Sequence, residues 1–152
     1  MIKDLCKVAK ICKKKKYKLY ISNNLKLAIK FKADGFYIPA FNKTTMNHLN
    51  YIKKNMLILG SAHSQKEIYE KKRQKCSIIF LSPIFKTKKY KKNNQLGTVK
   101  FNLISNVNKV NFYALGGINE YNFKKLKNSN AKGFGGVSFF QKKTGLNLGR
   151  FF

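Results

Sequence analysis

Six short apolar segments alternate with amphipathic segments along this chain of 152 residues, and no other feature limits the possible folds as strongly. The pattern predicts strands at residues 19–21, 36–38, 56–59, 77–81, 111–115 and 133–137. It predicts helices at residues 2–12, 25–31, 44–53, 64–72, 99–107 and 119–127. Such alternation is typical of parallel βα units. Because their crossover connections are right-handed, the folds that remain possible are a barrel and a doubly wound sheet. We expect a single α/β domain over residues 1–152, because no linker-like stretch divides the chain.

The charge balance limits the classes of partner. The chain has 33 Lys and Arg against 5 Asp and Glu, for a formal net charge of +28, and such a field attracts nucleic acids and phosphorylated metabolites. Only Arg73 and Arg150 are arginines, whereas specific base readout and bidentate phosphate binding favour arginine. Two interpretations stay open: a drift towards lysine in the background composition, and a basic surface that binds polyanions without sequence specificity.

The cysteine content and the lack of long apolar runs favour a cytoplasmic protein. Cys6, Cys12 and Cys76 have no zinc-binding spacing, and we expect them to be buried thiols in a reducing compartment. No apolar run approaches the roughly 20 residues that cross a bilayer. The first residues also lack the apolar core and cleavage site of a signal peptide. We therefore expect no membrane contact.

Two glycine-rich segments, at residues 114–119 and 133–138, follow or contain the last two predicted strands. Glycines after a strand let the backbone approach a phosphate, and a following helix adds N–H donors and the positive end of its dipole. In βα barrels, the loops after the last two strands are the usual phosphate site. The two segments therefore favour phosphate binding over the alternative, which is a pair of ordinary glycine turns.

Blocks of sequence between about residues 17 and 140 resemble the thiamine phosphate synthase/TenI family in order and spacing. The matching blocks are Leu27-Ala28-Ile29, Ala33-Asp34-Gly35, Gly60-Ser61-Ala62-His63-Ser64, Ser82-Pro83-Ile84-Phe85-Lys86-Thr87, Leu96-Gly97 and Ala114-Leu115-Gly116-Gly117-Ile118-Asn119. The resemblance implies a (β/α)8 barrel. Because the chain begins just before the family's third strand, we expect an incomplete TIM-barrel-like fold of about six βα units that lacks the first two strands. The outer strands would be open edges, which a homo-oligomer or the first helix would cover.

The resemblance also implies a role in thiamine biosynthesis and a small phosphate ester as ligand. The family's synthase joins a hydroxymethylpyrimidine pyrophosphate to a thiazole phosphate and releases pyrophosphate with Mg²⁺ present. The residues implied for the thiazole phosphate follow the last two strands: Gly116, Gly117, Val137 and Ser138. Thr87 would position the substrates, and Lys88 or Lys89 would face the pyrophosphate.

At two positions the sequence departs from the metal site that the resemblance implies. The family's first magnesium-binding aspartate falls on Asn23 and its second falls on Asn42. Neutral amides are poor substitutes for carboxylates around a hard cation, and with only five acidic residues a carboxylate-rich site is difficult to build. We therefore expect no certain cofactor, with Mg²⁺ needed only if the synthase activity is retained.

Three further side chains are candidates for chemistry. His63 follows a predicted strand and is the one candidate for catalysis, because a histidine can carry a proton near neutral pH. The alternative is a polar residue beside the helix cap formed by Ser64 and Glu67. Tyr37 and Phe41 lie in or after the second predicted strand, where they would either stack on a ring or pack in the core. The tautomerase histidine of TenI proteins falls on a proline, so that activity is not supported.

Three functions remain open at this point. The first is a synthase-like transferase of thiamine biosynthesis, and the second is a non-catalytic or metal-independent TenI-like protein that binds a phosphate ester. The third is a basic nucleic-acid-binding module, which only the net charge supports, because no RNP, KH, zinc-finger or helix-turn-helix pattern is present.

Overall fold

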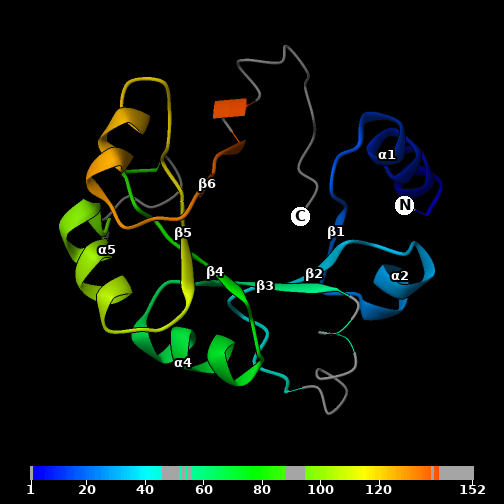
Figure 1. Ribbon diagram of the computed structural model, residues 1–152, viewed down its shortest axis with the longest axis horizontal. Coiled ribbons are helices and arrows are strands. Elements are labelled where there is room, and N and C mark those ends of the chain that lie inside the picture. Colours follow the sequence, from blue (N-terminus) through cyan, green and yellow to red (C-terminus); the bar gives the residue numbers. More distant parts are fainter. Residues whose placement is uncertain are drawn as a thin grey trace.

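The strands lie in one parallel sheet that curls into part of a barrel (Figure 1). The computed structural model describes residues 2–45, 52, 54, 56–87, 95–137 and 139–140. Within these residues the strands are β1 (Tyr20–Ser22), β2 (Gly35–Ile38), β3 (Leu57–Ala62), β4 (Ile78–Leu81), β5 (Asn111–Leu115) and β6 (Phe134–Gly135). The helices are α1 (Ile2–Lys15), α2 (Leu25–Lys30), α4 (Gln65–Arg73), α5 (Gly97–Asn106) and the 3-10 helix η1 (Phe123–Asn128).

The strand order identifies the sheet as part of a barrel. The strands are neighbours in the order β1-β2-β3-β4-β5-β6, and each neighbouring pair is parallel. A doubly wound sheet reverses its strand order at a switch point, and this sheet does not. The prediction of an incomplete TIM-barrel-like α/β fold is therefore confirmed.

One face of the sheet is buried beneath the helices. Successive side chains of a strand point to opposite faces, so every second residue enters this core. Its strand residues are at most 1% exposed and comprise Phe36, Ile38, Ile58, Ile79, Leu81, Phe112 and Ala114. They pack with Ile68 of α4 and Phe101 of α5 in a single cluster. Full burial of such side chains contributes about 1.5–3 kcal/mol each before conformational entropy is counted, so this cluster holds the strand ends in place.

The opposite face of the sheet lines a groove of about 690 Å³. Tyr37, Leu59 and Phe80 line this groove, and the rings of Tyr37 and Phe80 meet edge-on with 6.3 Å between their centroids. Helix α1 lines the groove beside β1 through residues that include Leu5 and Val8. In an eight-stranded barrel, inward side chains fill the corresponding space.

One helix end agrees with prediction and one predicted helix differs from it. Helix α1 ends at Lys15, within the lysine run at residues 13–16 that is expected as its solvated end, because lysines in a last turn complement the negative end of the helix dipole. The predicted helix at residues 119–127 is replaced by the shorter η1. The Oδ1 atom of Asn119 accepts the N–H groups of Tyr121 and Asn122, and such local bonds compete with helix formation. The predicted helix at residues 44–53 lies almost wholly outside the described residues.

The cysteines lie in three different environments. Cys76 is buried, as expected, and burial raises the pKa of its thiol to about 12. Cys12 is half-buried, but Cys6 is exposed, so the expectation of burial was wrong for this residue. The reason is that α1 has no buried residue and packs against the core only along one side, through Leu5. Among the described residues, no helix is long and apolar enough to cross a membrane.

Candidate functional site

The glycine turn after β5 lies where the carboxyl ends of β5 and β6 meet. Leu115 pairs in register with Gly135 of β6, so the two glycine-rich strand ends are neighbours. Gly116 and Gly117 adopt φ angles of 91° and 73°, in the left-handed region that favours glycine. A Cβ atom on Gly117 would lie 2.5 Å from the carbonyl oxygen of Lys86. The turn therefore needs glycine and brings bare backbone to this edge of the sheet.

The segment after β4 packs directly onto this turn. The N–H of Ile84 donates to the carbonyl oxygen of Leu115 over 2.9 Å, and the N–H of Phe85 donates to that of Gly116 over 3.1 Å. These bonds hold the segment that leads to Thr87. The Oγ1 atom of Thr87 is buried and has no hydrogen-bond partner among the described residues. Because such a group costs about 1–3 kcal/mol, a ligand atom that bonds to it is favoured.

Two asparagines that the sequence analysis did not single out hold the other side of the turn. The Nδ2 atom of Asn122 donates to the carbonyl oxygen of Gly117 over 2.8 Å. Its Oδ1 atom accepts the backbone N–H of Asn119, also over 2.8 Å. An Asn-x-x-Asn pair after two glycines is a signal for such side-chain turns, but it does not say which backbone atoms the side chains will reach.

The other residues implied for phosphate and pyrophosphate are only partly described. Val137 follows β6 and is 41% exposed at this edge of the sheet. Ser138, Lys88 and Lys89 lie outside the described residues, and their roles stay predictions.

His63 lies at the carboxyl end of β3, beside the start of α4. Its backbone N–H donates to Oε2 of Glu67 over 2.6 Å, while the hydroxyl of Ser64 caps the helix by accepting the N–H of Glu67. The ring atom Nδ1 lies 3.0 Å from both the carbonyl oxygen and the hydroxyl oxygen of Ser82. The predicted helix cap is therefore confirmed, and the ring is oriented by the strand end next to its own.

Tyr37 and Phe41 do not form a common stacking surface. Tyr37 is half-buried against Phe80, and desolvation raises the pKa of its phenol, partly offset by a hydrogen bond with Ser61. Phe41 is 75% exposed, and it takes part in none of the ring contacts found among the described residues.

The two positions that the resemblance aligns with magnesium ligands are in direct contact. The Nδ2 atom of Asn42 donates to Oδ1 of Asn23 over 2.6 Å. The orientation of both amides follows from a second bond, in which the backbone N–H of Thr44 donates to Oδ1 of Asn42 over 2.8 Å. Since a backbone N–H can only donate, the oxygen of Asn42 faces Thr44 and its nitrogen faces Asn23.

This donor set does not fit Mg²⁺. A hard cation binds oxygen ligands and prefers carboxylates, but both amide oxygens of the pair already accept hydrogen bonds. What the pair offers to a ligand is chiefly the remaining N–H groups. The part of the chain that the structure describes also holds no group of three or more His, Cys, Asp and Glu suited to a metal ion.

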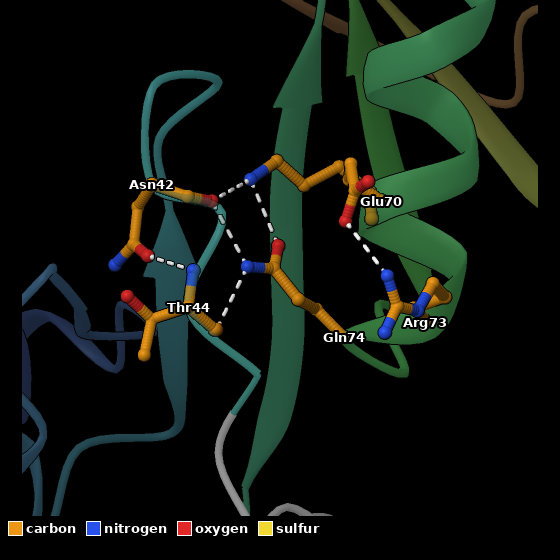
Figure 2. A network of polar contacts seen from close by, with 6 residues as sticks. Asn42, Thr44, Glu70, Arg73 and Gln74 are labelled. Atoms are coloured by element: carbon orange, nitrogen blue, oxygen red, sulfur yellow. Dashed lines mark hydrogen bonds and ion pairs between the residues drawn. The ribbon is translucent and has the colours of Figure 1, made fainter.

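A buried lysine, Lys71, holds the loop that carries Asn42, and Figure 2 shows Gln74 reaching the same loop. The Nζ atom of Lys71 donates to the carbonyl oxygens of Pro39 and Asn42, each over 2.7 Å, and to Oε1 of Gln74 over 2.8 Å. The Nε2 atom of Gln74 donates to the carbonyl oxygens of Asn42 and Thr44, each over 2.9 Å. The side chains of Lys71 in α4 and Gln74 at its C-cap thus bind three carbonyl groups of one loop.

The sequence does not predict this network, because lysine is ordinarily exposed. Lys71 and Gln74 are each 0% exposed. A faint signal was present, since Lys71 follows the buried Ile68 at helical spacing and so shares its face. Burial lowers the pKa of the Lys71 ammonium group, while the charges of Cys76, Glu67 and Glu70 oppose this shift.

Comparisons with known proteins agree with the family resemblance. The solved structure of thiamine phosphate pyrophosphorylase from Pyrococcus furiosus superimposes with a TM-score of 0.65 at 19% sequence identity, which shows a shared fold. The match covers 83% of this chain and 60% of that protein. No curated protein sequence matches the chain. The family model described as thiamine monophosphate synthase matches residues 1–140, and the chain therefore belongs to the thiamine monophosphate synthase family.

Proposed function

We propose that this protein binds a thiazole phosphate ester at the carboxyl ends of β5 and β6, and that it needs no metal ion to do so. The observation that carries the proposal is the buried Thr87 hydroxyl, which has no partner in the described part of the chain and lies at the end of a segment that packs on the Gly116–Gly117 turn. A free hydroxyl and bare backbone at a barrel edge suit the oxygens of a phosphate group.

We choose a thiazole phosphate as the ester because the chain belongs to the thiamine monophosphate synthase family. Its phosphate would accept hydrogen bonds from the backbone around Gly117 and Val137 and from the Ser138 hydroxyl. The ring would face the groove, because Leu115 and Val137 line both the groove and this edge. The net charge of +28 would draw the anion towards the protein.

Coupling of the ester to a hydroxymethylpyrimidine pyrophosphate is the second candidate function. The observation in its favour is that the loops after β1 and β2 meet through Asn23 and Asn42 at this carboxyl edge. Their free N–H groups suit an anion. The residues present do not fit Mg²⁺, so no step of this proposal passes through a metal ion.

Isothermal titration calorimetry of the full chain with hydroxyethylthiazole phosphate tests the proposal. We expect binding in EDTA with the same affinity as in Mg²⁺, and weaker binding by the Ser138→Ala variant. Ser77→Ala, at the opposite end of β4, is the matched control and should bind normally. Absence of binding by the wild-type protein, or binding that requires Mg²⁺ and pyrophosphate together, would contradict the proposal.

A single-stranded oligonucleotide in the same calorimeter tests the alternative that the net charge suggests. Binding through charge alone falls steeply as salt is added. If the oligonucleotide binds tightly at physiological salt and the thiazole phosphate does not bind, the nucleic-acid-binding module becomes the better interpretation.

A further inference from the structure

Lys71 places a positive charge inside the protein, and no ion pair between it and an acidic side chain occurs among the described residues. Its side chain is 0% exposed, and its Nζ atom donates to three neutral oxygens, those of Pro39, Asn42 and Gln74. Burying an ammonium group is costly unless its hydrogen bonds are well satisfied. Three donors and three acceptors at 2.7–2.8 Å satisfy this lysine fully.

The sheet leaves room for this lysine. A Cβ atom on Gly60 of β3 would lie 2.9 Å from Cδ of Lys71 and 2.8 Å from Sγ of Cys76. The aliphatic part of Lys71 therefore crosses β3 where the strand has no side chain. From there the ammonium group of Lys71 reaches the carbonyl oxygen of Asn42 in the loop after β2.

The loop that Lys71 holds carries one half of the amide pair. Lys71 binds the backbone oxygen of Asn42, and the side chain of the same residue reaches Asn23 on the neighbouring loop. Gln74 binds the backbone oxygens of Asn42 and Thr44, while the Thr44 N–H orients the Asn42 amide. One unbroken chain of hydrogen bonds thus runs from α4 to the carboxyl edge of β1.

We propose that Lys71, assisted by Gln74, is a positioning residue that acts as a built-in cation. Its ammonium group binds the backbone carbonyl oxygens of Pro39 and Asn42 in the loop after β2. This contact holds the side-chain amide of Asn42 in hydrogen-bonding position to Asn23 without a metal ion between them. The inference rests on the proposed function only in taking this carboxyl edge as the ligand site.

Stability alone does not account for such an arrangement. Replacing a buried charged group and its partners by apolar residues of similar volume is often neutral or stabilising. Methionine, which has a similar length, would keep the packing of the Lys71 side chain, although it would leave the carbonyl oxygens of Pro39 and Asn42 without this donor. A positioning role instead predicts a local effect that is confined to the loop and the amide pair.

Nuclear magnetic resonance of the full chain measures this local effect without any ligand. In Lys71→Met, we expect the Asn42 side-chain amide protons to move to the positions that they take in Asn23→Ala, where the amide bond is absent. We also expect the Thr44 amide to exchange with solvent at least tenfold faster, while the Ile79 amide in the core strand β4 reports any global loss of stability. The matched control is Lys72→Met, which removes an exposed neighbour that contacts Asn108.

The outcomes separate the possibilities. If Lys71→Met keeps the Asn42 resonances and the Thr44 exchange rate of the wild type, the positioning role is refuted, whatever happens to the melting temperature. If Ile79 exchange shows that Lys71→Met does not fold, Gln74→Met decides the question, because it removes the Gln74 bonds to the same loop and keeps the charge. A loop unchanged in Gln74→Met then refutes the proposal.

The affinity for hydroxyethylthiazole phosphate adds a functional measurement. We expect at least a fivefold loss in Lys71→Met and none in Lys72→Met. If the wild-type protein does not bind this ester, the proposed function fails, but the resonance and exchange measurements still decide whether Lys71 positions Asn42.

Discussion

The side-chain amide of Asn42 donates a hydrogen bond to Oδ1 of Asn23 over 2.6 Å, and so joins the loops that follow two neighbouring strands. These residues are 19 positions apart in the sequence and occupy the places that the family resemblance assigns to metal-binding carboxylates. An amide pair can bridge the loops directly, because each amide has both a donor and an acceptor. Two carboxylates in the same places would repel each other unless a cation lay between them.

Restoring both carboxylates should therefore create a dependence on Mg²⁺. We expect the Asn23→Asp/Asn42→Asp double variant to be less stable than the wild type in EDTA. Millimolar Mg²⁺ should then stabilise it by about 2 kcal/mol, as expected for a ligand at tens of times its dissociation constant. Thermal melting of both proteins with and without Mg²⁺ measures this difference.

A matched amide pair elsewhere in the chain provides the control. The Nδ2 atom of Asn130 donates to Oδ1 of Asn106 over 2.6 Å, in an exposed position. The Asn106→Asp/Asn130→Asp variant shows how much Mg²⁺ stabilises any adjacent pair of exposed carboxylates. Equal stabilisation of the two double variants, or a clear effect of Mg²⁺ on the wild type, would show that the carboxyl edge has no special preference for the metal.

The turn after β5 should not tolerate an alanine at Gly117. The substitution combines a positive φ with a collision against the segment after β4, so we expect a loss of about 2–4 kcal/mol in unfolding free energy. Gly97→Ala is the control, because Gly97 also has a positive φ of 64° but has no atom within 4 Å of a built Cβ. It should lose only about 1 kcal/mol. Urea denaturation measures both, and equal losses would mean that the collision is relieved at no cost.

Removing the Thr87 hydroxyl should have opposite effects on stability and on binding. The hydroxyl is buried and has no hydrogen-bond partner within the residues that the structure describes, so Thr87→Val should leave the free energy of unfolding unchanged or raise it slightly in the free protein. The same variant should bind hydroxyethylthiazole phosphate about tenfold more weakly, corresponding to about 1.4 kcal/mol for one lost hydrogen bond. Thr98→Val in the first turn of α5 is the control for the change of side chain. Unaltered affinity in Thr87→Val would remove Thr87 from the proposed site.

Acid should weaken the protein partly through Asp34. Its carboxylate accepts the backbone N–H of Leu19 and the ammonium group of Lys18, each over 2.9 Å, and these bonds lower its pKa below the ordinary 3.8. A carboxyl group with a lowered pKa stabilises the folded state above its ordinary pKa, and this contribution disappears as the pH falls through the folded-state value. Asp34→Asn should therefore lose about 1 kcal/mol at pH 6, because the side chain is partly exposed.

The stability of Asp34→Asn and that of the wild type should converge at low pH. Urea denaturation at several pH values between 6 and 2 follows this convergence. Lys18→Met removes only the exposed ion pair and should retain most of the pH dependence, since the Leu19 N–H is the largest cause of the lowered pKa. A constant difference between the Asp34→Asn variant and the wild type across this range would contradict the assignment.

The features that the sequence by itself predicts are those set by interactions between residues close together in the chain. The apolar segment at residues 111–115 became β5 with the same limits, and Ser64 caps α4 as its spacing with Glu67 indicates. The paired glycines at residues 116–117 form a turn with positive φ, because few other residues adopt that conformation. Periodicity, caps and glycine turns depend on neighbours within a few residues, so a sequence displays them directly.

Only the tertiary structure decided how Asn23, Asn42 and Lys71 come together. Lys71 is one lysine among many, and its helical spacing from Ile68 is too common a pattern to mark it as the one that is fully buried. Its acceptors Pro39 and Asn42 lie 32 and 29 residues away, and Asn42 lies 19 residues from Asn23. These contacts form because parallel pairing brings the carboxyl ends of β1, β2 and β3 to one edge and α4 packs against β3. The residue types therefore indicated which side chains could form hydrogen bonds. The pairing of the strands and the packing of α4 decided which of these side chains are in contact.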